Sequence, residues 1–131
     1  MNENVIRECT ERSFAGTIRF PEVVERLGAV GVERYTADLT RLEKTVYDAS
    51  GESYVEPLPL ADAPPVADDF SAVGVQEALA DVQQGRIGYP EFLRRIMAAG
   101  VASYGVFLEG RRALYVSRQG KVHVERFPGT P

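Results

Sequence analysis

The stretch "FPEVVERLGAVGVERYTADL", residues 20–39, is followed later in the chain by "YPEFLRRIMAAGVASYGVFL", residues 89–108. Pro21 of the first stretch matches Pro90 of the second, and we call the separation between these two prolines the repeat offset. The repeat offset joins further identical residues: Gly16 and Gly85, Ile18 and Ile87, Glu22 and Glu91, Arg26 and Arg95, Gly31 and Gly100, Tyr35 and Tyr104, Leu39 and Leu108, Glu56 and Glu125. Chance identity is about one position in fifteen at ordinary composition. We therefore predict an internal duplication, with a slip of one residue that makes Tyr47 the counterpart of Tyr115.

Two helices open each predicted repeat. Apolar residues at helical spacing predict a first helix that ends near Gly16, and its counterpart ends near Gly85. A second helix begins at Pro21 and at Pro90, because a proline in the first turn loses no helical hydrogen bond. A glycine closes this helix in both repeats, since glycine readily takes the left-handed conformation found there.

Three strands follow in each repeat. Tyr35, Ala37 and Leu39 alternate in the way that places side chains on one face of a sheet. Shorter strands are predicted around residues 45–48 and 52–56, and their counterparts around residues 113–116 and 121–125. Short turns that contain glycine join these strands and are typical of antiparallel hairpins. Each repeat is therefore expected to run helix, helix, strand, strand, strand.

The chain is expected to form one domain from two repeats, residues 3–59 and 69–128. Four prolines predict an extended linker over residues 57–68, and Asp68 or Asp69 is expected to cap the next helix. A half of about 65 residues would be only marginally stable alone. We therefore predict an α+β fold in which the halves share a core around an approximate two-fold axis. It would contain one six-stranded antiparallel sheet, or two abutting sheets, backed by four helices.

The composition excludes several classes of protein. The 131 residues are 44% hydrophobic and 26% charged, as in soluble globular proteins. A net charge of −4 does not favour binding to nucleic acid. No apolar run approaches the ~20 residues that span a bilayer, and no signal peptide is evident, so we expect a cytoplasmic protein without a membrane partner. With one Cys, one His and no cofactor motif, we expect no disulfide, metal or cofactor.

The two copies share the pattern "[FY]PE, six or seven residues, AxGVxxY", followed by a short strand, a tyrosine, a glycine turn and "VE". This pattern resembles a bacterial family of unknown function whose members are often labelled phage-envelope-like proteins. The resemblance covers nearly the whole chain and implies a small duplicated α+β protein. It implies no activity and no catalytic residue. Phe107 stands where the first copy has Asp38, so a role for that acid would not be two-fold symmetric.

Tyrosines on the predicted inner face are the first candidates for a binding site. Tyr35 and Tyr104 recur in both repeats and could supply hydroxyl groups to a cleft between them. The alternative, which we favour, is that they are core residues with satisfied hydroxyl groups. The same two interpretations apply to Tyr47 and Tyr115. Cys9 is expected to be a small buried hydrophobe, because its counterpart is an alanine.

Acidic residues and the single histidine are further candidates. His123 and Glu125 lie two residues apart on a strand and could act as an acid and a base. Glu56 and Glu125 could face each other across the two-fold axis. The interpretation that we favour places His123 on an exposed polar face of an outer strand. In the same interpretation, the carboxylates of Glu56 and Glu125 are solvated, or their charges are balanced by Arg34 and Arg126.

Taken together, these features favour a non-enzymatic module that binds a small molecule or a protein between its repeats. The expected binding residues are Tyr35, Tyr104, Glu56, Glu125 and His123. One alternative is a small metal-free hydrolase or isomerase that uses His123 and Glu125. Another is a structural protein of phage origin, which would self-assemble. The sequence leaves open the identity of the ligand and the choice between monomer and homodimer.

Overall fold

The computed structural model describes residues 1–130 and contains four helices and six strands in this part of the chain. In chain order they are α1 (Glu3–Ala15), α2 (Phe20–Ala29), β1 (Val32–Asp38), β2 (Glu43–Asp48), β3 (Ser53–Pro57), α3 (Ala72–Gln83), α4 (Tyr89–Ala98), β4 (Val101–Phe107), β5 (Arg112–Ser117) and β6 (Val122–Arg126). Each element of the second half begins one repeat offset after its counterpart in the first half. The predicted α+β class is confirmed.

The six strands form one antiparallel sheet in the order β3-β2-β1-β4-β5-β6, rather than two abutting sheets. The halves meet where β1 pairs with β4 at the centre of this sheet. Thr36 lies opposite Gly105, which is its own counterpart by the repeat offset. An approximate two-fold axis through this pair would produce the observed register.

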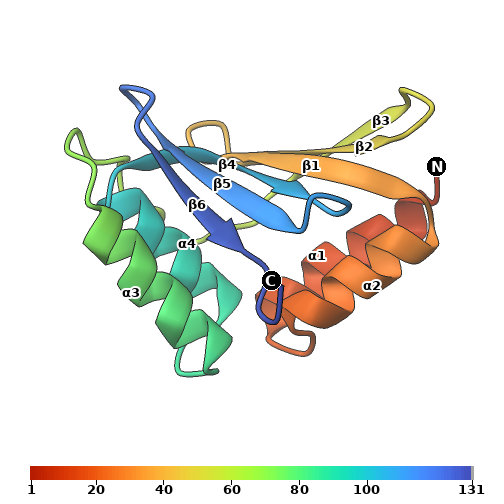
Figure 1. The fold of residues 1–131 in the computed structure, drawn as a ribbon, viewed down its shortest axis with the longest axis horizontal. Helices are drawn as coiled ribbons and strands as arrows, with labels where there is room; N and C mark the ends of the chain where they lie inside the picture. The colour runs from red at the N-terminus through yellow and green to blue at the C-terminus, as the bar shows by residue number, and fades with distance from the viewer. Residues whose placement is uncertain (131) are drawn as a thin grey trace.

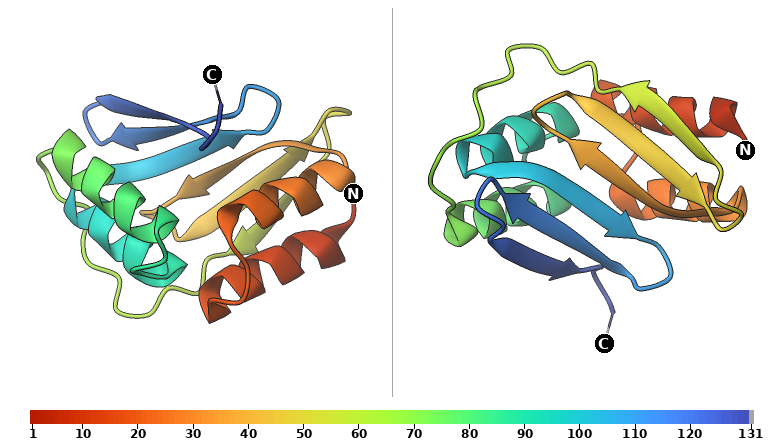
Figure 2. Two further views of the ribbon diagram at one scale, coloured as in Figure 1. Left: turned by 60° about the horizontal axis from the view of Figure 1, so that its bottom comes forward. Right: turned by 90° about the horizontal axis from the view of Figure 1, so that it is seen from above.

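All four helices lie on one face of the sheet, and the other face carries no helix (Figure 1). The helices form two pairs, α1 with α2 and α3 with α4, which lie side by side below the strands (Figure 2). The segment after β6 leaves the edge of the sheet in front of the gap between the two pairs, as seen in the view of Figure 1. The apolar core fills the space between sheet and helices and includes Leu27 of α2, Ile96 of α4 and Val106 of β4. None of the helices within residues 1–130 has the length and apolar character needed to cross a bilayer.

Glycine and serine determine the helix ends. Gly16 ends α1 in the left-handed conformation, with φ of 76°. Gly100 follows α4 with φ of 96°, and a Cβ atom there would clash with the carbonyl oxygen of Asp69. Helix α3 begins after Ser71, whose hydroxyl accepts a hydrogen bond of 3.0 Å from the amide of Gly74. The prediction that Asp68 or Asp69 caps this helix is therefore wrong.

The linker lies against α4, which explains why the cap is displaced. The amide of Ala67 donates to the carbonyl of Met97, and the amide of Ser71 donates to the carbonyl of Ala99. These two bonds hold residues 67–71 against the C-terminal end of α4, so that the helix α3 begins only after Ser71. Asp68 instead pairs with Arg118 in the turn between β5 and β6. Figure 2 shows the linker passing along one side of the molecule.

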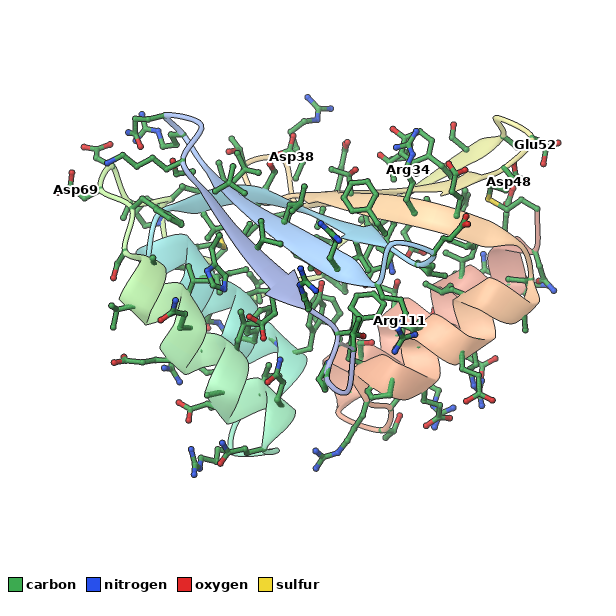
Figure 3. All side chains as sticks on the ribbon, viewed as in Figure 1. Arg34, Asp38, Asp48, Glu52, Asp69 and Arg111 are labelled. Carbon is green, nitrogen blue, oxygen red and sulfur yellow. The ribbon has the colours of Figure 1, made fainter. Side chains whose placement is uncertain are left out.

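The register of the strands corrects the predicted slip between the repeats. Tyr35 pairs with Val46, whereas Tyr104 pairs with Tyr115, so Val46 is the counterpart of Tyr115. Tyr47 lies on the outer face of the sheet, where the guanidinium of Arg34 stacks 3.9 Å from its ring centroid. Figure 3 shows Arg34 on the face opposite the helices. Tyr47 is therefore not a core residue, and the repeat offset holds throughout.

Asp38 has a structural function at the end of β1. Its Oδ1 accepts hydrogen bonds of 3.0 Å from the amides of Thr40 and Arg41. These bonds order the turn between β1 and β2. Figure 3 shows that Asp38 lies above the sheet, on the side away from the helices. The side chain is therefore remote from the space between the two helix pairs.

Candidate functional site

A cavity of about 530 Å³ lies between the two helix pairs, on the helix-covered side of the sheet. We call it the larger cavity. Residues from all four helices line it, together with Tyr35 of β1 and Lys44 of β2. The turns that join the helices of each pair, around Arg19 and Arg86, form its exposed end. Its volume falls within the range of small-molecule sites.

A smaller cavity of about 100 Å³ adjoins the larger one in the second half. Tyr104 and Tyr115 of the sheet line it, with Phe92 of α4. Phe20, Tyr35, Val82, Gln83, Tyr89 and Pro128 line both cavities. The two spaces therefore share a wall between the halves of the molecule.

Three buried polar residues, Thr10, Lys44 and Glu56, form what we call the polar cluster. Lys44 points to the inner face of the sheet because it alternates with the buried Val46 on β2. Its Nζ donates to the Oγ1 of Thr10 at 3.2 Å, and Thr10 in turn donates to Oε1 of Glu56. The same carboxylate oxygen lies 4.0 Å from Nζ. Lys44 is 5% exposed and Glu56 is 4% exposed.

Burial dominates the electrostatics of the polar cluster. Desolvation lowers the pKa of Lys44, while the charge of Glu56 acts in the opposite direction. Desolvation raises the pKa of Glu56, although the hydrogen bond from Thr10 and the charge of Lys44 act against it. Both charged forms are thus disfavoured by the loss of water. The prediction that Glu56 is solvated or balanced by Arg34 is wrong.

Four inward-facing tyrosines, Tyr35, Tyr89, Tyr104 and Tyr115, form what we call the tyrosine cluster. The rings of Tyr35 and Tyr104 meet edge to face with centroids 6.5 Å apart, and Tyr104 stacks on Tyr115 at 5.3 Å. The hydroxyl groups of Tyr89 and Tyr104 are hydrogen-bonded to each other. Burial raises the pKa of Tyr89 to about 12, and burial also raises the pKa of Tyr35, Tyr104 and Tyr115. These phenols are therefore neutral at physiological pH.

Only one residue of the polar cluster is matched by the same residue type in the second half. Thr10 is replaced by Leu79, and Lys44 by Ala113, while Glu56 corresponds to Glu125. Glu125 accepts a hydrogen bond of 3.2 Å from Gln83. The first half therefore places a buried lysine on the wall of the larger cavity, whereas the second half has an aromatic lining.

The predicted acidic and histidine candidates are not brought together between the halves. Glu56 lies on β3 and Glu125 on β6, which are opposite edges of the sheet, so these carboxylates do not face each other. His123 lies 3.2 Å from Glu125, but its side chain is only 14% exposed and lies beside the ring of Tyr115. The expectation of an exposed outer face is therefore wrong for His123. Glu125 lines the smaller cavity, and among the described residues His123 lines neither.

Sequence reasoning missed Lys44 and Thr10. A signal was present, because Lys44 lies two residues before Val46 on a strand and its counterpart is the apolar Ala113. The assumed slip matched Lys44 with Arg112 instead, and two basic residues at matched positions suggest a solvated surface. Thr10 carried a weaker signal, namely a polar residue whose counterpart is Leu79.

Cys9 and two arginines of α4 make contacts within the fold. Cys9 is fully buried, and burial raises the pKa of its thiol, which disfavours the reactive thiolate. Arg95 pairs with Asp81 at 2.5 Å, and Arg94 donates to the carbonyl of Ala61. Within residues 1–130 no three His, Cys, Asp or Glu side chains are grouped closely enough to hold a metal ion.

Comparison with protein families and with curated proteins gives no match. Candidate functions therefore follow from the geometry of the cavities and from the residues that line them.

Proposed function

We propose that the protein is a ligand-binding module that holds a small organic molecule in the larger cavity. The observation that carries this proposal is one cavity of about 530 Å³ whose wall comes from both halves and includes the buried Lys44. Membership of the phage-envelope-like family, which the sequence pattern suggests, would add no activity to this proposal.

The lining has the composition of a small-molecule site. Phe20, Val23, Tyr35 and Tyr89 supply apolar and aromatic surface, and a ligand that covers it gains free energy by removing it from water. A small number of polar groups, chiefly those of the polar cluster, would fix the orientation of the ligand. Neutral phenols of the tyrosine cluster can both donate and accept hydrogen bonds.

An enzyme built on His123 and Glu125 is less well supported by the geometry. General acid and base groups must reach the substrate directly or through one water molecule. Glu125 reaches the smaller cavity of about 100 Å³, but His123 lies outside the lining of both cavities. A binding function requires no such pair.

Ligand-observed NMR with a library of small organic fragments tests the proposal. The blocking variant is Ile87→Trp, because Ile87 lies in the turn between α3 and α4 and lines the larger cavity. The control is Val73→Trp, since Val73 is 61% exposed on α3 and lies outside the lining of both cavities. Fragments should bind the natural chain and the control but lose binding to Ile87→Trp. The proposal fails if no fragment binds, or if binding survives in the blocking variant.

A further inference from the structure

We propose that the ligand of the larger cavity is an organic carboxylate with an apolar body, whose carboxylate group binds to Lys44. This inference rests on the proposed function and specifies the chemical class of the ligand. It assigns the recognition of the anionic group to Lys44 and the recognition of the body to the aromatic wall around Tyr35 and Phe20.

The charged side chains that line the larger cavity are all basic, although acidic partners lie behind two of them. Three cationic side chains line it, those of Arg19, Lys44 and Arg86, and no Asp or Glu of the described residues does so. Arg86 forms an ion pair with Asp81, in which Nη1 lies 3.1 Å from Oδ1. The guanidinium of Arg19 makes no hydrogen bond or ion pair within residues 1–130. A negatively charged ligand would therefore meet cations at the exposed end and at the buried wall.

Lys44 has hydrogen-bonding capacity that the protein does not use. An ammonium group has three N–H donors. In the part of the chain that the structure describes, one of them is accepted by Thr10 Oγ1, and Nζ also lies over the ring of Tyr35, 4.4 Å from its centroid. The nearest carboxylate oxygen, on Glu56, is 4.0 Å away and already accepts the hydroxyl of Thr10. A buried ammonium is costly unless it is paired and hydrogen-bonded, so an acceptor oxygen on the ligand would stabilise it.

A carboxylate fits this site better than a phosphate. A phosphate group has several acceptor oxygens and is usually held by a helix N-terminus, a nest of amides or several basic groups. Arg19, Arg86 and Gly88, the N-cap of α4, lie at the exposed end of the larger cavity. At its buried wall a single ammonium is available, and Val23, Tyr35 and Leu58 line the same cavity with apolar surface. A ligand with one carboxylate group on an apolar body matches both the single buried ammonium and the apolar wall.

Differences between the halves give the ligand one orientation. Ala113 stands in place of Lys44, and Leu79 in place of Thr10, so the second half offers no matching cation to the anionic group. Its side of the wall carries Tyr89 and, in the adjoining smaller cavity, Phe92. The anionic group is therefore placed in the first half, and the apolar body extends toward the second.

Isothermal titration calorimetry with octanoate, octanol and octylamine tests the assignment, because these molecules share a chain and differ in the charge of the head group. The natural chain should bind octanoate about ten- to a hundredfold more tightly than octanol, since a hydrogen bond to a charged group contributes about 1.5–3 kcal/mol. Octylamine should bind no more tightly than octanol.

The double variant Lys44→Met with Glu56→Gln should remove this preference while keeping the binding of octanol. Both changes are made together because Lys44→Met alone would leave a buried carboxylate without its cation. The matched control is Lys121→Met, since Lys121 is exposed and is the only other lysine of the chain. Circular dichroism verifies that each variant is folded. The assignment is overturned if the double variant still prefers octanoate, or if the control loses the preference.

A second measurement needs no variant. In the natural chain labelled with ¹³C and ¹⁵N at lysine only, two lysine side chains give signals, and octanoate should shift those of Lys44 but not those of Lys121. Unchanged Lys44 signals at saturating octanoate would overturn the assignment. If fragments bind in the cavity but octanoate binds no better than octanol, only the ligand class is wrong. If neither the fragments nor octanoate bind, the proposed function fails as well.

Discussion

At the scale of single residues, the hydrogen bond between Tyr89 and Tyr104 connects α4 to the centre of the sheet. Tyr89→Phe should destabilise the fold by about 1–3 kcal/mol, because it leaves the buried hydroxyl of Tyr104 without its partner. Tyr104→Phe should have a similar effect. The double variant should cost clearly less than the sum of the two, as measured by urea unfolding. Additive costs would show that the two hydroxyl groups are not energetically coupled.

The polar cluster makes stability depend on pH in two windows. Between the lowered pKa of Lys44 and its ordinary value of 10.5, the unfolded chain binds more protons, so Lys44 makes the free energy of unfolding rise with pH. Between the ordinary value of 4.5 and the raised pKa of Glu56, the folded chain binds more protons. Glu56 therefore makes the free energy of unfolding fall as pH rises through that window.

Urea unfolding at a series of pH values tests this dependence. The free energy of unfolding of the natural chain minus that of the Lys44→Met, Glu56→Gln variant should fall with pH in the acidic window and rise in the alkaline window. Taking the difference removes the contribution of the tyrosines, which both chains share. A difference that is flat in both windows would contradict the electrostatics described for the pair.

At the scale of secondary-structure elements, the start of α3 distinguishes two capping residues. Ser71→Ala should lower the free energy of unfolding by about 1 kcal/mol, because the amide of Gly74 loses its acceptor. Asp69→Ala is the matched control and should change it by less than about 0.5 kcal/mol, since Asp69 is exposed on the linker (Figure 3). Chemical denaturation measures both, and the reverse order would contradict the assignment of the cap.

Most elements could be predicted from the sequence because local chemistry determines them. Pro21 and Pro90 fix the first turns of α2 and α4, and alternating burial identifies β1 and β4. The register of β2 is harder to predict from the sequence. Matching Tyr47 with Tyr115 indicates a slip of one residue, which the pairing of Val46 with Tyr35 excludes. That slip also concealed Lys44, so one error in register removed the main polar residue from the predicted site.

At the scale of the whole molecule, the pairing of β1 with β4 joins the halves into one sheet, and we interpret the matching halves as the product of duplication. One sheet predicts one cooperative unfolding transition. Because the chain contains no tryptophan, Phe20→Trp and Phe107→Trp provide a fluorescent reporter in each half. Both variants should give coincident midpoints by fluorescence and by circular dichroism. Separate midpoints for fluorescence and circular dichroism within either variant would show that the halves unfold independently.

The candidate site could be predicted only in part, because it depends on the order of the strands. Tyr35 and Tyr104 were expected to face inward between the repeats, and periodicity alone is sufficient for that inference. The positions of Glu56 and Glu125 on opposite edges follow from strand order, which no local pattern determines. A polar residue buried by tertiary packing, such as Lys44, is likewise recognised only when the neighbouring helix is placed.

The most direct test of a ligand site between the halves is a crystal structure of the protein grown with octanoate. We expect electron density for the ligand in the larger cavity, with its carboxylate within hydrogen-bonding distance of Lys44 Nζ and its chain against Tyr35 and Phe20. Side chains that fill this space, or octanoate bound only elsewhere on the molecule, would contradict the existence of the site.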